Sequence, residues 1–356
     1  MNILFRVDAG ETVGMGHIMR CLALAQSLES SNVRTHFVVN SETLALCEHR
    51  QDWVGKLYAL PLFDHINGEL NWLKSFCANH PIDGLVIDGY TFSEHYRENF
   101  QTLNLPVICF DDMNNSGKLF ADLVINGAEE AHKLNYNETA PEAILCIGER
   151  YRVLRKEFST SQSKPFTERT ELMVTMGGSD PAMLTLPVLK ALEKQDFTGS
   201  VNLVTGAANS EVDSIVEYVK SSRLNITHHH DCQSMAALMK QSRLAISAAG
   251  GSQFELLACS CPSVLVVVAD NQLSATRTAE QQGWCKTIDM RSFNQGSAEE
   301  RTERLHAIQN LVQLAVGLWD QHDKLVKMHQ HACAYANTHG AERVVENIQE
   351  LLSRGN

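Results

Sequence analysis

Short apolar runs rich in β-branched residues alternate with longer amphipathic stretches along most of the chain. Runs of roughly 4 to 8 such residues, bounded by polar or glycine-containing segments, are typical of buried strands. In the first half they cover residues 3–7, 35–40, 84–88, 107–111 and 123–126. The stretch 17–28 instead repeats its apolar side chains at helical spacing. This alternation predicts βα units around a parallel sheet.

The pattern is interrupted once and then starts again. Residues 159–167 (STSQSKPFT) are polar, contain a proline and lack periodicity, as linkers do. Beyond them we predict strands at 171–176, 201–205, 244–248 and 264–268, helices at 182–193 and 211–220, and only helix from 301 to 353. The sequence therefore predicts an α/β protein with Rossmann-like domains at 1–158 and 168–330, and a helical tail at 331–356 that packs back onto the first domain.

Length and charge limit the classes of function. At 356 residues the chain suits two α/β domains of roughly 150 residues each. Its formal charge of −12 argues against a nucleic-acid partner. An anionic ligand is therefore expected to be held locally, by backbone N–H groups and a few side chains.

Targeting signals are not evident. The opening MNILFRVDAG carries two charges and does not resemble a signal peptide, and the apolar run 263–269 is too short to cross a bilayer. Ten cysteines are scattered without paired metal-ligand spacing, which fits reduced thiols. We expect a cytoplasmic protein without stable membrane association, either a monomer or a weak homo-oligomer.

The first candidate site follows the first predicted strand. Gly10, Gly14 and Gly16 supply flexible backbone where the loop enters a helix, and helix N-termini attract anions. His17 stands at that N-terminus, where the positive helix end favours a neutral imidazole able to accept a proton. His17 is therefore a candidate catalytic base, and a histidine in an ordinary helix cap is the alternative. One glycine of the dinucleotide fingerprint is missing, which argues against a nicotinamide cofactor.

Two further glycine pairs follow predicted strands in the second half. Gly177, Gly178 and Ser179 precede Asp180 and Pro181, where either Ser179 or Asp180 caps a helix with Pro181 in its first turn. For this segment, a capped turn and a phosphate-binding loop are both possible interpretations. The second pair, with its neighbours, is better suited to a diphosphate. It comprises Gly250, Gly251 and Ser252.

Polar side chains near that second pair suit a sugar nucleotide. Glu255 lies one turn into the following helix, where its carboxylate can accept hydrogen bonds from a ribose diol. Asn271 and Gln272 follow the next strand, and their amides can both donate to and accept from sugar hydroxyl and acetamido groups. Either amide alone is more typical of a loop cap. Together with Glu255 they predict a sugar-nucleotide site.

Three other groups are ambiguous. Tyr90 follows the strand at 84–88 and either points into the same site or lies on its rim. Asp111 and Asp112 end the next strand, where turn capping is favoured over a metal or acid–base pair. The run 228–230 (HHH) invites a metal assignment, but adjacent strand residues point to opposite faces, so we interpret it as a loop at a strand end.

Seven ordered segments resemble one protein family. They are RVDAGETVGMGHIMRCLALAQSL, VIDGY, FDDM, ADLVING, GERYRVLRKEF, MGGSDP and LAISAAGGSQFELL with the following VVVADNQ. Over residues 1–285 the chain resembles the UDP-sugar hydrolases of the pseudaminic acid pathway and the related spore-coat polysaccharide proteins. That family is similar in fold to GT-B glycosyltransferases, with two Rossmann-like domains facing across a cleft.

The resemblance implies an activity and roles for residues. The substrate would be UDP-2,4-diacetamido-2,4,6-trideoxy-β-L-altropyranose, from which UDP is removed. His17 would be the general base with Tyr90 beside it. Gly250, Gly251 and Glu255 would hold UDP, and Asn271 and Gln272 would lie near the sugar or its phosphates. The chain departs from the family's usual residues at Gln253 and Phe254, which affects the choice of sugar more than the reaction type.

One base is sufficient for such a hydrolysis. Glycoside hydrolysis normally uses two carboxyl groups, but UDP leaves readily as an anion, because the second pKa of a phosphate is about 6. A water, a histidine base and donors to the diphosphate then suffice, and we expect inversion at the anomeric carbon without metal or cofactor. The alternatives are a GT-B glycosyltransferase, a non-catalytic sugar-nucleotide sensor and a dehydrogenase.

Overall fold

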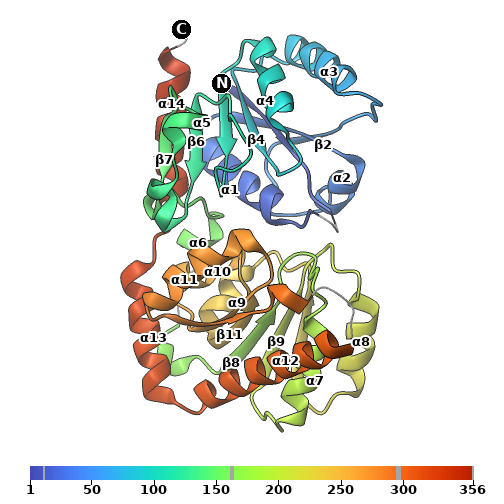
Figure 1. Ribbon diagram of the computed structural model, residues 1–356, viewed down its shortest axis with the longest axis vertical. Helices are drawn as coiled ribbons and strands as arrows, with labels where there is room; N and C mark the ends of the chain where they lie inside the picture. Colours follow the sequence, from blue (N-terminus) through green and yellow to red (C-terminus); the bar gives the residue numbers. More distant parts are fainter. Residues whose placement is uncertain (11–12, 161–163, 294–297, 355–356) are drawn as a thin grey trace. The chain divides into compact units, whose positions relative to one another are not determined.

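The computed structural model describes residues 1–10, 13–160, 164–293 and 298–354, which fold into two compact units. Unit 1 contains Met1–Lys156 and Asn337–Asn356, and unit 2 contains Glu157–Ala336. Unit 1 therefore carries both the blue start of the chain and its last red helix (Figure 1). The chain passes back to unit 1 at residue 337, whereas the predicted tail began at residue 331.

Unit 1 is built on seven parallel strands in the order β3-β2-β1-β4-β5-β6-β7. The strands are β1 (Asn2–Val7), β2 (Arg34–Val39), β3 (Lys56–Ala59), β4 (Gly84–Asp88), β5 (Val107–Phe110), β6 (Leu123–Asn126) and β7 (Ile144–Ile147). The helices are α1 (Gly16–Ser30), α2 (Ser41–Cys47), α3 (Ile66–Asn79), α4 (Glu94–Phe100), α5 (Tyr136–Thr139) and α14 (Gly340–Arg354). The predicted strands of this half are confirmed to within one residue at each end.

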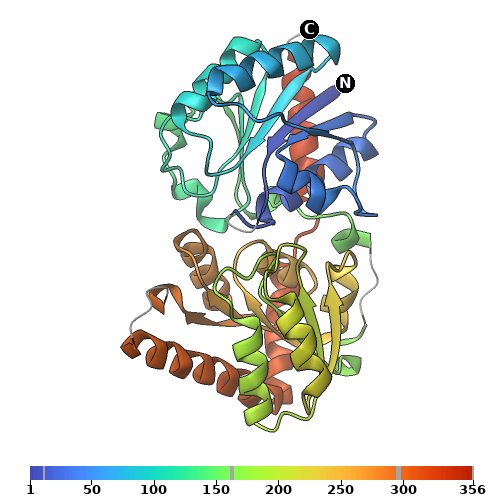
Figure 2. The same cartoon turned by 90° about the vertical axis from the view of Figure 1, so that its right-hand side faces the viewer.

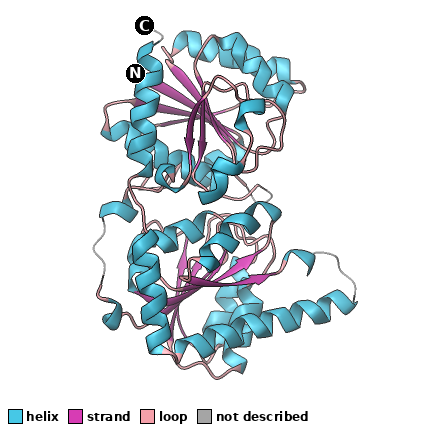
Figure 3. Cartoon of the chain, turned by 60° about the vertical axis from the view of Figure 1, so that its left-hand side comes forward, coloured by secondary structure: helices cyan, strands magenta, loops and turns pink. Residues whose placement is uncertain are grey.

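The strand order of unit 1 reverses next to β1. The chain leaves β1 through α1 to β2 on one side, and later reaches β4, on the other side of β1, through α3. Because parallel crossovers are right-handed, α1 and α3 cover opposite faces of the sheet. Figure 3 shows helices on both faces. Open α/β sheets bind ligands at such a reversal, beyond the carboxyl ends of the two strands.

The last helix completes the core of unit 1. α14 packs on α1 and along β6 and β7, and in Figure 2 this red helix lies against the sheet of unit 1. It buries Val344, Val345, Ile348 and Leu352. The backbone enters the helix through a close approach, since a Cβ on Gly340 would lie 2.0 Å from the carbonyl oxygen of Arg152. Only glycine fits there.

Unit 2 has six parallel strands in the order β10-β9-β8-β11-β12-β13, so its order reverses between β8 and β11. The strands are β8 (Glu171–Thr175), β9 (Ser200–Thr205), β10 (Asn225–His230), β11 (Ser242–Ala248), β12 (Ser263–Val267) and β13 (Cys285–Asp289). The helices are α6 (Glu157–Thr160), α7 (Thr185–Lys194), α8 (Val212–Ser221), α9 (Met235–Gln241), α10 (Gly251–Ala258), α11 (Leu273–Gln281), α12 (Ala298–Trp319) and α13 (His322–Tyr335).

Three local predictions for unit 2 need correction or restriction. The histidine run lies within β10 rather than in a loop after it. The helix expected at residue 182 begins at Thr185, because Asp180 (φ 48°) and Met183 (φ 47°) are left-handed and hold the chain out of the helix. The predicted linker falls partly outside the described residues, and its Phe166 is buried and stacks on His329. Within the described ranges, no helix combines the length and apolar character needed to span a membrane.

Candidate active site

His17 is the second residue of α1, the helix that follows β1. Ahead of the helix, Gly14 N donates to Gly10 O (2.8 Å), with Gly14 at φ 78°. Gly16, the first residue of the helix, has open space where a side chain would begin. The His17 side chain itself is largely buried, at 7% exposure. The imidazole is thus fixed at the strand-order reversal of unit 1.

Asp88 sets the orientation of the imidazole. It is the last residue of β4, is 1% exposed, and its Oδ1 lies 2.7 Å from His17 Nδ1. A carboxylate can only accept, so Nδ1 carries the hydrogen and donates it to Asp88. In the neutral imidazole this leaves Nε2 as the basic atom. An aspartate that fixes a histidine tautomer in this way is the arrangement of a general base.

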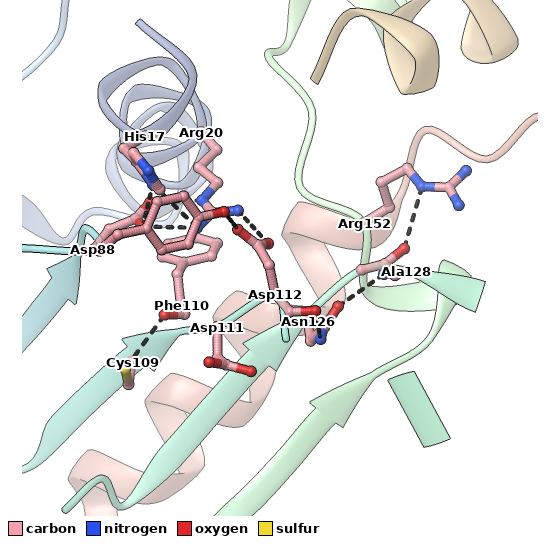
Figure 4. Close-up of polar contacts among 12 residues, drawn as sticks. His17, Arg20, Asp88, Cys109, Phe110, Asp111, Asp112, Asn126, Ala128 and Arg152 are labelled. Carbon is pink, nitrogen blue, oxygen red and sulfur yellow. Dashed lines mark hydrogen bonds and ion pairs between the residues drawn. The ribbon is translucent and has the colours of Figure 1, made fainter. Parts of the chain in front are cut away.

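Arg20 joins Asp88 to a second carboxylate. It lies one turn after His17 on α1, and its Nε and Nη2 donate to the two oxygens of Asp88 at 2.6 and 2.7 Å. Its Nη1 donates to Oδ1 of Asp112 at 2.7 Å. Figure 4 shows the Arg20 guanidinium reaching both carboxylates beside His17. The ends of the neighbouring strands β4 and β5 are thereby held by one side chain.

The charges of this group are mutually stabilised. Burial alone raises the pKa of Asp88, but the charges and hydrogen bonds of Arg20 and His17 outweigh it and hold that pKa well below its ordinary value. Burial likewise raises the pKa of Asp112, and Arg20 and Tyr90 outweigh it and lower that pKa. For Arg20, burial lowers the pKa, but Asp112 and Asp88 raise it well above its ordinary value. Both carboxylates are therefore anionic at neutral pH.

Tyr90 forms the exposed side of the group. Its hydroxyl donates to Oδ2 of Asp112, and its ring meets that of His17 edge to face, with centroids 4.6 Å apart. Its 60% exposure leaves room for a ligand to touch it. The structure thus brings Tyr90 to His17, as the sequence allowed.

Asp111 and Asp112 do not form a pair. Asp111 accepts from Tyr136 OH (2.7 Å) and from Asn114 N (2.8 Å), so it caps the turn, as favoured from the sequence. Asp112 instead points to Arg20 and Tyr90. Figure 4 shows the two side chains directed to different places. No group of three or more potential ligands could hold a metal within the part of the chain that is described.

In unit 2, both glycine pairs border the strand-order reversal. Gly177 and Gly178 follow β8, while Gly250 and Gly251 follow β11. Gly250 has φ 110°, Gly251 begins α10, and the space around Gly177 and Gly251 is open where a side chain would begin. Ser252 and Glu255 lie in the first two turns of α10 and are half-buried. Backbone N–H groups at such a helix start can approach an anion closely.

The loop after β8 is capped by Asp180. Its carboxylate accepts from the backbone N–H groups of Leu184 (3.0 Å) and Thr185 (2.9 Å), while Ser179 is buried beside it. Pro181 precedes the helix rather than lying in its first turn. Of the two candidate caps, Asp180 is therefore the one that makes these bonds.

Asn271 and Gln272 lie in a short 3-10 turn, Asp270–Gln272, which follows β12. The Gln272 side-chain oxygen accepts from Val268 N at 2.9 Å, so its amide nitrogen is left to donate. That nitrogen would lie 3.5 Å from a Cβ placed on Gly250. Gln272 is therefore a donor beside the Gly250 turn.

Sequence reasoning missed two members of the unit 1 group. Arg20 was not singled out, although it lies three residues after His17 and so on the same side of the helix. Asp88 was noted only as the end of a strand. The signal that could have identified Asp88 is its position, as a charged residue at the end of an otherwise apolar buried strand.

Comparisons with known proteins identify similar proteins of low sequence identity. No protein-family model matches the chain. The chain is 29% identical over 287 residues to the uncharacterized protein MJ1062 of Methanocaldococcus jannaschii, a match covering 77% of this chain and only 56%, about half, of that protein. It is 25% identical to the spore coat polysaccharide biosynthesis protein SpsG of Bacillus subtilis, over 80% of this chain and 82% of SpsG.

A third relative is the UDP-2,4-diacetamido-2,4,6-trideoxy-β-L-altropyranose hydrolase of Campylobacter jejuni, 22% identical over 80% of this chain and 98% of the hydrolase. Among solved structures, S. aureus MnaA with UDP matches at TM-score 0.67 and 15% identity, covering 99% of this chain and 97% of that one. The calicheamicin glycosyltransferase CalG4 matches at TM-score 0.59 and 13% identity, covering 99% and 98%. The fold is GT-B-like, and these similarities support a PseG/SpsG-like family.

Proposed function

We propose that the protein is a UDP-sugar hydrolase, which releases UDP from a UDP-activated diacetamido-trideoxy sugar by attack of water at the anomeric carbon. The observation that carries this proposal is the buried hydrogen bond between His17 and Asp88. It fixes the imidazole with Nε2 as the basic atom, which is what a general base for water needs. The relatives named above supply the substrate class.

We assign recognition of the nucleotide to unit 2. The Gly250 turn and the start of α10 offer backbone N–H groups to a diphosphate, and Gln272 adds a side-chain donor beside them. Glu255, one turn into α10, suits a ribose diol as a hydrogen-bond acceptor. Gly177, Gly178, Ser179 and Asn271 remain candidate contacts on the same unit.

The proposed step is balanced by one proton transfer. The water oxygen bonds to the anomeric carbon while the bond from that carbon to the phosphate oxygen breaks, and UDP leaves with the electron pair. His17 Nε2 accepts the water proton, and Asp88 stabilises the imidazolium that forms. UDP leaves as an anion without a general acid, so neither metal nor cofactor is required.

A glycosyltransferase is the second candidate, because the chain shares its fold with a glycosyltransferase over nearly its whole length. Transfer and hydrolysis differ only in the acceptor that His17 would deprotonate. The discriminating experiment is to incubate the protein with the UDP-sugar and no acceptor, and to measure UDP. Hydrolysis predicts continuous release of UDP with one free sugar per turnover, and a transferase predicts little release until an acceptor is added.

Variants connect that activity to the site. His17→Ala is expected to lower turnover by at least about 100-fold while UDP still binds, because the base is lost but the unit 2 loops are intact. His49→Ala is the matched control, since that histidine side chain is 90% exposed. Turnover of His17→Ala equal to that of His49→Ala would show that His17 is not the base.

A further inference from the structure

Arg20 occupies a special position between two strand ends. Asp88 ends β4 and Asp112 follows β5, and both carboxylates face the same guanidinium. Two anions at neighbouring strand ends repel each other unless a cation lies between them. Arg20 supplies that cation from α1. Its guanidinium carbon lies over the Phe110 ring, 4.9 Å from the ring centroid.

Each carboxylate oxygen of this group has a direct partner. Asp88 Oδ1 receives His17 Nδ1 and Arg20 Nη2, and Asp88 Oδ2 receives Arg20 Nε. Asp112 Oδ1 receives Arg20 Nη1, and its Oδ2 receives the Tyr90 hydroxyl. One planar fork therefore connects the partner of His17 to the partner of Tyr90.

We propose that Arg20 is a positioning residue for the reaction, which holds Asp88 against His17 and Asp112 against Tyr90 at the same time. The catalytic role of Arg20 rests on the proposed function, but its effect on the His17 imidazole does not require substrate. The fixed fork of arginine suits this task, because it makes two parallel bonds to Asp88 and a third bond to Asp112 in one geometry. A lysine in its place keeps the charge and loses the fork.

The experiment uses the full chain and reads the imidazole directly. Nitrogen-15 NMR of the substrate-free protein reports which ring nitrogen of His17 carries the hydrogen, and His17→Ala assigns the signals. The variants are Arg20→Gln, Arg20→Lys and Asp112→Asn. The matched control is Arg34→Gln, which removes an exposed arginine at the start of β2.

We expect wild type and Arg34→Gln to show a single Nδ1–H tautomer. Arg20→Gln is expected to show a mixture of tautomers and a kcat lower by about 100-fold, with KM within about threefold, because positioning and not nucleotide binding is lost. Arg20→Lys is expected to keep the tautomer and to lose about tenfold in kcat. Asp112→Asn is expected to lose about tenfold, because the anchor of Tyr90 is weakened.

A single Nδ1–H tautomer in folded Arg20→Gln, with kcat equal to that of Arg34→Gln, would overturn the proposal. If Arg20→Gln does not fold, Arg20→Lys and Asp112→Asn decide: a kcat within twofold of the control in both overturns it, and a loss of about tenfold with unchanged KM supports it. If wild type releases no UDP, the proposed function fails, and the NMR comparison still tests whether Arg20 fixes the imidazole.

Discussion

Asp88 combines burial with ionisation. A lone buried carboxylate takes up a proton, whereas this one receives hydrogen bonds from His17 and Arg20 and stays charged. Because its backbone belongs to β4, in the middle of a buried sheet, its position is set by the fold rather than by a loop. The His17 imidazole is thus oriented by a residue of a central strand of unit 1.

Asp88→Asn tests that orientation at constant shape. The asparagine can present its NH2 group to Nδ1, which favours the tautomer with hydrogen on Nε2, and it removes the charge that stabilises the imidazolium. We expect kcat to fall by roughly 100- to 10,000-fold with KM little changed. The steady-state rate of UDP release measures this, and a kcat within threefold of wild type would remove Asp88 from the mechanism.

The same carboxylate predicts how stability depends on pH. The pKa of Asp88 is depressed below its ordinary value of 3.8, so its stabilisation is complete above that value and is lost as pH falls through the lower, folded-state pKa. Asp88→Ala should cost about 3 kcal/mol of unfolding free energy near neutral pH, and less below about pH 4. Urea unfolding of both proteins at several pH values measures the difference.

A difference that does not shrink on acidification would contradict that prediction. The thiols of Cys21 and Cys109 do not contribute to this pH dependence, because burial raises the pKa of each thiol and keeps it protonated. The titratable groups that face Asp88 are His17, Arg20 and Cys21 from α1, Cys109 from β5, and Asp112.

At the residue scale, the sequence predicted which residues lie at the site better than it predicted their hydrogen-bond partners. His17 and Tyr90 were identifiable because each follows a predicted strand end. That Asp112 turns to Arg20 while Asp111 turns to Tyr136 depends on side-chain directions after β5, which no spacing rule reports. Only the folded chain brings residues 20, 88 and 112 together.

At the scale of elements, the start of α10 is the part of unit 2 on which the nucleotide assignment depends. Gly251→Ala tests it. Apart from its chain neighbours and its own helix backbone, no described residue comes within 4 Å of the added methyl, so the fold tolerates it, but the methyl occupies the space that a diphosphate would use. We expect an unchanged or slightly higher Tm and a Kd for UDP raised by at least about tenfold, measured by calorimetry.

Gly317→Ala is the matched control for that substitution. Gly317 lies in the last turn of α12 and also has open space at its Cβ position. This change should raise the unfolding free energy by about 0.5–1 kcal/mol and leave UDP affinity unchanged. If Gly251→Ala binds UDP as tightly as Gly317→Ala does, the diphosphate does not lie at this turn.

The central strands were predictable and the edges were not. β1, β4 and β6 are mainly apolar and buried because both of their faces are covered. β3 (KLYA) and β10 (NITHHH) are edge strands with half-exposed, polar residues, so they lack that signal. β10 pairs in parallel with β9. This strand pairing brings His228 Nε2 to 2.8 Å from Thr205 Oγ1.

At the scale of the whole molecule, the chain returns to its first unit. α14 is separated from α1 by more than three hundred residues, yet it covers the same side of the sheet. The sequence supported a helical tail, because apolar residues recur at helical spacing in 340–354. The residue at which the chain crosses back could not be read from that pattern, because α13 and α14 are both amphipathic and differ only in their partner.

Removal of residues 337–356 should therefore unfold unit 1 selectively. The buried side chains of Val344, Val345, Ile348 and Leu352 would be lost, a cost on the order of 6 kcal/mol or more, comparable to the whole stability of a domain. Calorimetry of the truncated chain should show the transition of unit 2 without that of unit 1. Retention of both transitions would show that α14 is dispensable.

The oxygen that water delivers tests the central claim most directly. Turnover of UDP-2,4-diacetamido-2,4,6-trideoxy-β-L-altropyranose in oxygen-18 water, followed by mass spectrometry of both products, reports which bond is broken. Attack of a His17-activated water on the anomeric carbon places one heavy oxygen in the free sugar and none in UDP. Heavy oxygen in UDP, with an unlabelled sugar, would contradict it.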